Sequence, residues 1–162
     1  MTRSALRRLA TLILLCLIVA APGIASAFYV VPADEGETAG QRLIVENEIV
    51  VVTMVGASAA WNNAITWEGD ARGDFLCRDV PPGFTSVVGR FQRRTELPLG
   101  LITPEGDVWT TGPAERNRDN VAHARLTVTG PDSVLVEWED QPGGGDVDYN
   151  DCVVQLSITR AR

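Results

Sequence analysis

Lysine is absent from the sequence, and all 14 basic side chains are arginine. This absence excludes Schiff-base and lysine-nucleophile chemistry. Acidic residues number 21, so the formal net charge is −7. The acidic balance argues against a nucleic-acid or anionic-membrane partner, because phosphate binding needs clustered positive charge. Hydrophobic residues make up 45% of the 162 residues, which is typical of a globular protein with one domain.

The N-terminus has the layout of an export signal. Arginines at positions 3, 7 and 8 precede an apolar run over residues 9–21, and Ala25-Ser26-Ala27 forms a small-residue cleavage motif. The run is too short for a comfortable membrane span. We therefore predict a secretory signal peptide over residues 1–27 and a single domain over residues 28–162. That domain is expected outside the cell or in the periplasm, with no membrane span after cleavage.

Residues after the signal favour an all-β fold. Short segments rich in β-branched residues alternate between apolar and polar positions, and turn sequences with Gly, Pro and Asp separate them. This spacing predicts an antiparallel β-sandwich of jelly-roll type. The clearest predicted strands cover residues 49–55, 122–129, 134–138 and 152–158, and weaker ones cover residues 29–31, 65–67, 86–91, 97–102 and 108–110. Residues 33–41 are expected to form a loop, and residues 57–63 are the one place where a helical turn is expected.

Two cysteines, Cys77 and Cys152, lie in the predicted mature domain. Export permits a disulfide between them, but the sequence leaves open whether they form a bridge or two separate buried thiols.

An acidic segment between two predicted strands is the most informative feature. Six carboxylates fall within residues 137–151, and no basic residue lies between Arg125 and Arg160. Crowded carboxylates repel one another unless they face water or surround a cation. Asp146, Asp148 and Asn150 alternate as in the first half of a calcium loop. We therefore predict a structural Ca²⁺ site with oxygen ligands from Glu139, Asp140, Asp146, Asp148, Asn150 and Asp151.

Other interpretations of this segment remain open. A solvated acidic loop with Asx-turns would use the same residue types, because Asp, Asn and Gly are ordinary turn residues. Mg²⁺ is less suitable because it demands stricter octahedral geometry. Zinc is disfavoured because the single histidine, His123, is distant in sequence and other nitrogen or sulfur ligands are scarce.

The acidic segment also carries a family resemblance. Its pattern, E-D-x-x-G-G-G-D-x-D-Y-N-D over residues 139–151, resembles the hallmark of the bacterial family called domain of unknown function 4114. Weaker similarities lie at residues 60–63, 95–101 and 117–124, so the resemblance spans about residues 45–158. It implies a secreted or surface-attached β-rich module, and it leaves the biochemical role open because none is established for the family.

Three polar residues upstream could support the predicted ligands from behind: Asn117, Asp119 and His123. The alternation of its predicted strand places His123 on the polar face, so we expect a surface or supporting histidine rather than a catalytic one. Among the tryptophans, Trp138 shares a face with apolar residues and is expected in the core. Trp61 and Trp109 lie near predicted loops and are the candidates for an exposed platform.

These features predict a secreted calcium-binding β-sandwich module without enzymatic activity. Its expected role is adhesion, or binding of a carbohydrate or another cell-surface component. The alternative is a small secreted hydrolase of glycosidase type that uses a pair of Asp or Glu residues across a cleft. The oligomeric state is not predicted.

Overall fold

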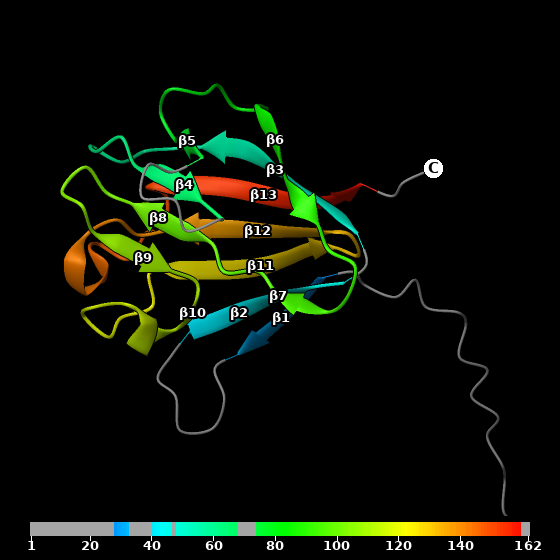
Figure 1. Cartoon of the computed structure of the whole chain (residues 1–162). Coiled ribbons are helices and arrows are strands. Elements are labelled where there is room, and N and C mark those ends of the chain that lie inside the picture. Colours follow the sequence, from blue (N-terminus) through cyan, green and yellow to red (C-terminus); the bar gives the residue numbers. More distant parts are fainter. Residues whose placement is uncertain (1–27, 33–39, 47, 68–73, 160–162) are drawn as a thin grey trace, which may run out of the picture.

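The computed structural model describes residues 28–32, 40–46, 48–67 and 74–159 (Figure 1). Within these ranges the regular structure consists of strands and two short 3-10 turns, η1 (Ala114–Arg116) and η2 (Pro142–Gly144). The predicted signal peptide lies outside the described residues and stays a prediction. The strands are β1 (Phe28–Pro32), β2 (Gly40–Val45), β3 (Ile49–Gly56), β4 (Ala64–Thr66), β5 (Phe75–Leu76), β6 (Thr85–Arg90), β7 (Thr95–Glu96), β8 (Gly100–Ile102), β9 (Val108–Thr110), β10 (Gly112–Pro113), β11 (Ala124–Gly130), β12 (Ser133–Trp138) and β13 (Cys152–Thr159).

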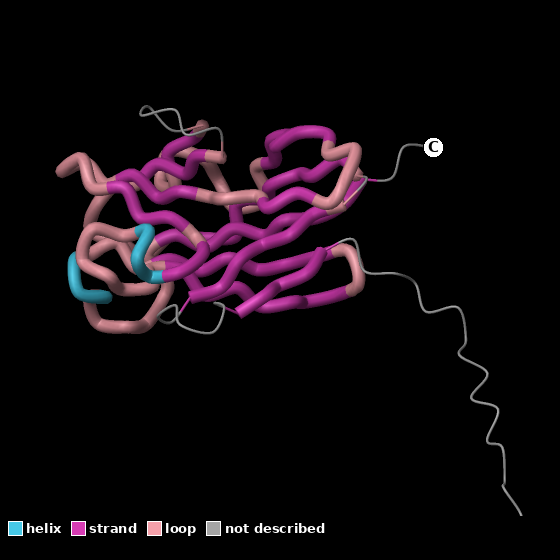
Figure 2. The backbone as a smooth tube through the Cα atoms, turned by 60° about the horizontal axis from the view of Figure 1, so that its bottom comes forward, coloured by secondary structure: helices cyan, strands magenta, loops and turns pink. Residues whose placement is uncertain are grey.

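The strands form three antiparallel sheets, which confirms the all-β prediction. The largest has the order β11-β12-β13-β3-β6, and a second has the order β5-β4-β8-β9. In the third, β2 lies between β1 and β10 and also pairs with β7. Figures 1 and 2 show the β5-β4-β8-β9 sheet lying over one face of the five-stranded sheet, as in a sandwich.

Alternation along the strands produces the core between these sheets. In β12 and β13 every second side chain is completely buried, whereas the residues between them are only partly covered. The β5-β4-β8-β9 sheet contributes Ile65, Leu101 and Trp109 to the same apolar cluster. The sequence correctly placed Trp138 in this core, where its exposed fraction is 0%.

The boundaries differ from the predictions at three places. The end of the predicted loop at residues 33–41 belongs to β2, which the sequence analysis missed. The predicted strand over residues 97–102 is interrupted by Pro98, and the chain passes there from β7 in one sheet to β8 in another. Proline has no N–H to continue the ladder, which explains the break. Residues 57–63 form no helical turn.

No helix among the described residues has the length and hydrophobicity needed to cross a membrane.

Candidate metal centre

The acidic connection between β12 and β13 is a tightly curled loop. Trp138 and Cys152 face each other where the two strands meet, and Asp151 N–H donates to Trp138 O at 3.2 Å. Between these points the chain passes through η2 and several residues with left-handed backbone conformations. These are Gly143, Gly144, Gly145, Val147 and Tyr149. In Figure 1 the loop is orange and lies at the left end of the molecule.

Three carboxylates of this loop converge on one point. One oxygen from each of Glu139, Asp146 and Asp148 lies within 4.8 Å of the others. Glu139 is 1% exposed, whereas both aspartates are exposed. The arrangement therefore has one buried carboxylate at its base and two at the solvent side. We call these residues the acidic trio.

The loop backbone fixes the orientation of Glu139. Its Oε1 accepts a hydrogen bond from Tyr149 N–H at 2.6 Å. A Cβ atom added at Gly145 would lie 2.5 Å from Glu139 Oε2, so the absence of a side chain at Gly145 makes room for the carboxylate. Burial raises the pKa of Glu139, partly offset by this hydrogen bond, and the negative charges of Asp146 and Asp148 raise it further. A cation between the three groups would remove the repulsion.

Asn150 lies beside the trio rather than apart from it. Its backbone N–H donates to Asp148 Oδ1 at 3.0 Å, and its side-chain amide donates to Asp148 Oδ2. The Asn150 side chain therefore contacts the trio through its amide nitrogen, which faces Asp148.

The other two predicted ligands form a separate pair behind the trio. Asp140 is 2% exposed and accepts a hydrogen bond from Asn63 Nδ2 at 2.8 Å. Asp140 N–H donates to Asp151 Oδ2, also at 2.8 Å. Burial raises the pKa of Asp151 to about 6, and the nearby charges of Asp140 and Glu139 contribute to the increase. We call the buried Asp140 and the half-buried Asp151 together the buried pair.

Two of the three upstream residues, Asp119 and His123, contact the loop segment, whereas Asn117 holds the chain before them. Asp119 Oδ2 accepts hydrogen bonds from Gly143 N–H at 2.8 Å and from His123 Nε2 at 2.9 Å. Burial alone would raise the pKa of Asp119, but these bonds and one from Val121 N–H outweigh it and lower the pKa. Asn117 accepts from Thr110 N–H at 2.7 Å and donates to Val121 O at 2.7 Å, which fixes the turn before His123.

His123 is buried, so the expected surface position is wrong. The side chain is 0% exposed and stacks on Trp109 with 3.8 Å between ring centroids. Strand β11 begins only at Ala124, so the alternation of that strand does not set the direction of His123. The other ring nitrogen, Nδ1, lies 3.0 Å from Glu139 O. Both nitrogens thus face oxygen atoms of the protein, and neither is available to a metal.

Trp109 is also buried, which corrects its expected role as an exposed platform. It is 0% exposed, and its indole N–H donates to Asp140 O at 2.7 Å. Val108 and Thr110, its neighbours in β9, are more exposed because the strand turns Trp109 inward. Trp109 therefore contributes to the support of the buried pair.

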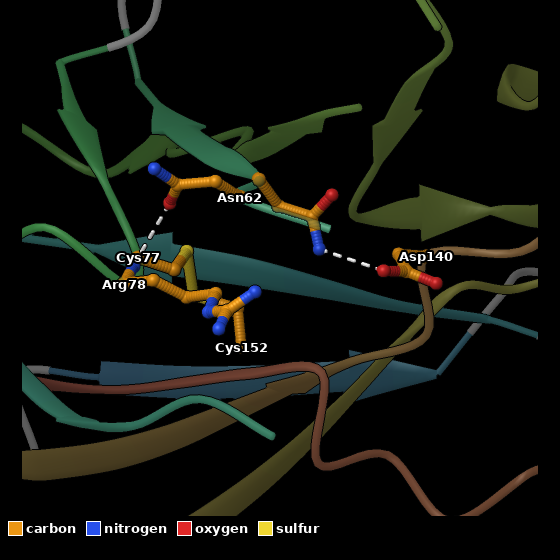
Figure 3. Close-up of a disulfide and its surroundings, with 6 residues drawn as sticks. Asn62, Cys77, Arg78, Asp140 and Cys152 are labelled. Carbon is orange, nitrogen blue, oxygen red and sulfur yellow. Dashed lines mark hydrogen bonds between the residues drawn. A yellow bond between two sulfur atoms is a disulfide. The ribbon is translucent and has the colours of Figure 1, made fainter. Parts of the chain in front are cut away.

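A disulfide answers the question that the sequence left open about the cysteines. Cys77 and Cys152 are bonded, with 6.0 Å between their Cα atoms and a sequence separation of 75 (Figure 3). The bridge joins the start of β13 to the segment around Asn63, because Cys77 N–H donates to Asn63 O at 2.7 Å. It therefore braces the two chain segments that hold the buried pair.

Asn63 is the supporting residue that the sequence analysis did not select. It lies 77 positions from Asp140, so its hydrogen bond depends on the packing of distant segments. The one signal for it was its place in the Trp61-Asn62-Asn63 segment that resembles the family.

The protein is an antiparallel β-sandwich that carries a carboxylate cluster at one end. Residues 108–159 match the model of the family Domain of unknown function (DUF4114), which confirms the predicted family over that segment. The match includes the acidic loop and the residues beneath it, and it covers less of the chain than the predicted span of residues 45–158. Comparisons with curated proteins and with solved structures found no match.

Proposed function

We propose that this protein is a secreted, calcium-binding, non-enzymatic module. Its ion would have a structural role in the acidic loop, and the domain would bind a carbohydrate or another component of a cell surface. The convergence of Glu139, Asp146 and Asp148 carries the metal half of this proposal. Burial of Glu139 makes that convergence costly without a counter-charge, because the loop contributes no basic side chain.

Calcium suits this loop better than other ions. Ca²⁺ accepts six to eight oxygen ligands in a flexible arrangement, and carboxylates, backbone carbonyls and water can all contribute. The trio provides three carboxylates, with Asn150 beside them and solvent on the open side. Zinc is disfavoured further because both nitrogens of His123 already face protein oxygens.

The disulfide supports the secreted location in this proposal. A disulfide between Cys77 and Cys152 is expected in an oxidising compartment, where such bonds persist. The predicted signal peptide over residues 1–27 agrees with that location.

Thermal unfolding with Ca²⁺ and with a chelator tests the metal site. An ion at 100 times its dissociation constant stabilises the folded state by about 2.7 kcal/mol. For a domain of this size the melting midpoint should rise by about 10 °C. An unchanged midpoint at saturating Ca²⁺ would overturn the proposal.

The matched variants are Asp148→Ala and Glu105→Ala. Asp148 belongs to the trio, whereas Glu105 is exposed in the turn before β9. We expect Asp148→Ala to abolish the shift in midpoint and Glu105→Ala to preserve it. Equal loss in both variants would place the ion elsewhere.

A further inference from the structure

A groove lined by residues of strands β6, β7, β8 and β9 has features of a saccharide site. It consists of two neighbouring hollows of about 290 Å³ and 310 Å³, which share Trp67 and Pro98 in their walls. The first hollow continues along Val88, Arg90 and Leu97, and the second continues along Gly100, Val108 and Thr110. In Figure 1 strand β7, at the first hollow, lies toward the right, whereas β8 and β9, at the second hollow, lie toward the left, the side of the acidic loop.

Gly100 forms part of the floor of the second hollow. A Cβ atom at this position would lie 2.8 Å from Thr66 Cγ2, so the hollow depends on the absence of a side chain. Thr66 itself is 4% exposed, and its hydroxyl has no hydrogen-bond partner among the described residues. Rotation of the Thr66 side chain would exchange its methyl group with this hydroxyl. The Thr66 hydroxyl therefore reaches the hollow only after this rotation, and Pro98 and Val108 give the hollow apolar walls.

Trp67 is a partly exposed aromatic side chain in a fixed position. Its backbone N–H donates to Asp74 Oδ2 at 2.9 Å, and its ring packs on Phe75 with 6.2 Å between centroids. A tryptophan held in this way presents an apolar ring and a polar N–H at low entropic cost. Such a combination suits the apolar face and the hydroxyl groups of a sugar ring.

Arg90 lines the first hollow, and two further arginines follow it in the sequence. Arg90, Arg93 and Arg94 lie within five residues of one another in a protein whose net charge is −7. Glu96 lines the same hollow, but its carboxylate is paired with Arg116 at 2.5 Å and 3.1 Å. No described acidic side chain pairs with Arg90. Among the described residues, the groove therefore has a guanidinium without a carboxylate partner at one end and a tryptophan shared by its two hollows.

We propose that this groove binds an anionic oligosaccharide that contains uronic acid. Trp67 stacks on one sugar ring, Thr66 and Thr110 bond its hydroxyl groups, and Arg90 pairs with the carboxylate of a neighbouring sugar. Guanidinium and carboxylate match in geometry, which favours a uronate over a neutral sugar at that end. The proposal rests on the recognition role proposed above, and it does not depend on calcium.

A single-stranded nucleic acid would also offer negative charge and stacking surfaces. The observations favour the saccharide, because nucleic-acid binding requires a longer track of positive charge than three arginines on an acidic protein. Binding of an oligonucleotide therefore enters the test as an outcome that overturns the proposal.

Isothermal titration with hexagalacturonate tests the groove in the full-length mature protein. We expect binding by the wild type and at least tenfold weaker binding by Trp67→Ala, while Trp61→Ala, a partly exposed tryptophan outside the groove, binds as the wild type does. Arg90→Gln should reduce the affinity for hexagalacturonate and remove its preference over cellohexaose. Thr110→Gln fills the second hollow without removing the tryptophan, and it should also weaken binding. This variant keeps the test decisive if Trp67→Ala does not fold.

Three results would overturn the proposal. One is no detectable binding of hexagalacturonate, another is unchanged affinity in a folded Trp67→Ala or Thr110→Gln variant, and the third is displacement of the saccharide by an oligonucleotide. The titrations are run with Ca²⁺ and with a chelator. The metal proposal is judged from the unfolding midpoint and the groove from the titration, so each can fail alone.

Discussion

The acidic trio and the buried pair come from one stretch of sequence, yet their carboxylates lie in different environments. The trio places Asp146 and Asp148 at the surface with the buried Glu139 beneath them. Its protein donors are Tyr149 N–H on Glu139 and the backbone and side-chain amides of Asn150 on Asp148. The buried pair has its own donors, Asn63 and the backbone of Asp140, and burial raises the pKa of Asp151. Both groups accept hydrogen bonds from the protein, so exposure rather than the presence of donors separates them. Asp146 and Asp148 face solvent, whereas Asp140 is enclosed by protein.

Removal of the disulfide should have the largest effect on stability. It also tests whether the trio is independent of the chain segments that hold the buried pair. We expect the double variant Cys77→Ala with Cys152→Ala to lose about 4 kcal/mol of unfolding free energy, because the bridge closes a loop of 75 residues. Urea unfolding measures this loss, and chemical reduction of the wild type should give a similar value. The Ca²⁺-dependent shift in midpoint should persist, since no member of the trio is bonded to either cysteine. Its disappearance would show that the two groups are not independent.

Substitution at Asn63 should affect the buried pair alone. Asn63→Ala leaves the buried Asp140 carboxylate without its side-chain donor, which should cost about 1–3 kcal/mol of unfolding free energy. The neighbouring Asn62→Ala removes an exposed hydrogen bond to Asp79 and should cost about 0.5 kcal/mol or less. Denaturant titration of both variants, with and without Ca²⁺, gives the comparison. Equal costs would mean that Asn63 does not support the pair.

The smallest expected effect is a pH dependence from Asp151. Its pKa in the folded state is about 6, above the ordinary value of 3.8, so the folded state holds this proton more tightly. Its contribution to stability is therefore fully present below 3.8 and is lost as the pH rises through about 6. Chemical unfolding in chelator across this range should show the decline.

Asp151→Asn should flatten that decline, whereas the exposed change Glu105→Gln should keep it. A slope that is unchanged in Asp151→Asn would assign the titration to another carboxylate. Below pH 3.8 the lowered pKa of Asp119 acts in the opposite direction, because stability from that group is lost as the pH falls.

Much of the fold could be predicted from local patterns. Alternation in β12 and β13 correctly identified both strands and their buried faces, because a strand turns successive side chains to opposite sides. The same rule failed at His123, which lies just outside β11. Trp109 was expected at the surface for another reason, its position near predicted loops, and that expectation was also wrong. The alternation rule also missed β2, whose pairing with β1, β7 and β10 depends on distant segments.

The candidate site was predictable only as a segment. Composition located the six oxygen-bearing residues between two strands. Their division into the trio, the buried pair and Asn150 depends on the left-handed backbone at Gly145 and Val147 and on the hydrogen bond from Asn63. None of these has a local signal strong enough to fix a distance between side chains.

By itself, the sequence determined that this is an all-β protein whose acidic segment joins two strands, because periodicity and charge are local properties. The tertiary structure decided which carboxylates meet, that Cys77 bonds Cys152, and that Trp67 rather than Trp109 faces a groove. These outcomes depend on how distant strands pack, and packing sets the distances between side chains that lie far apart in the chain.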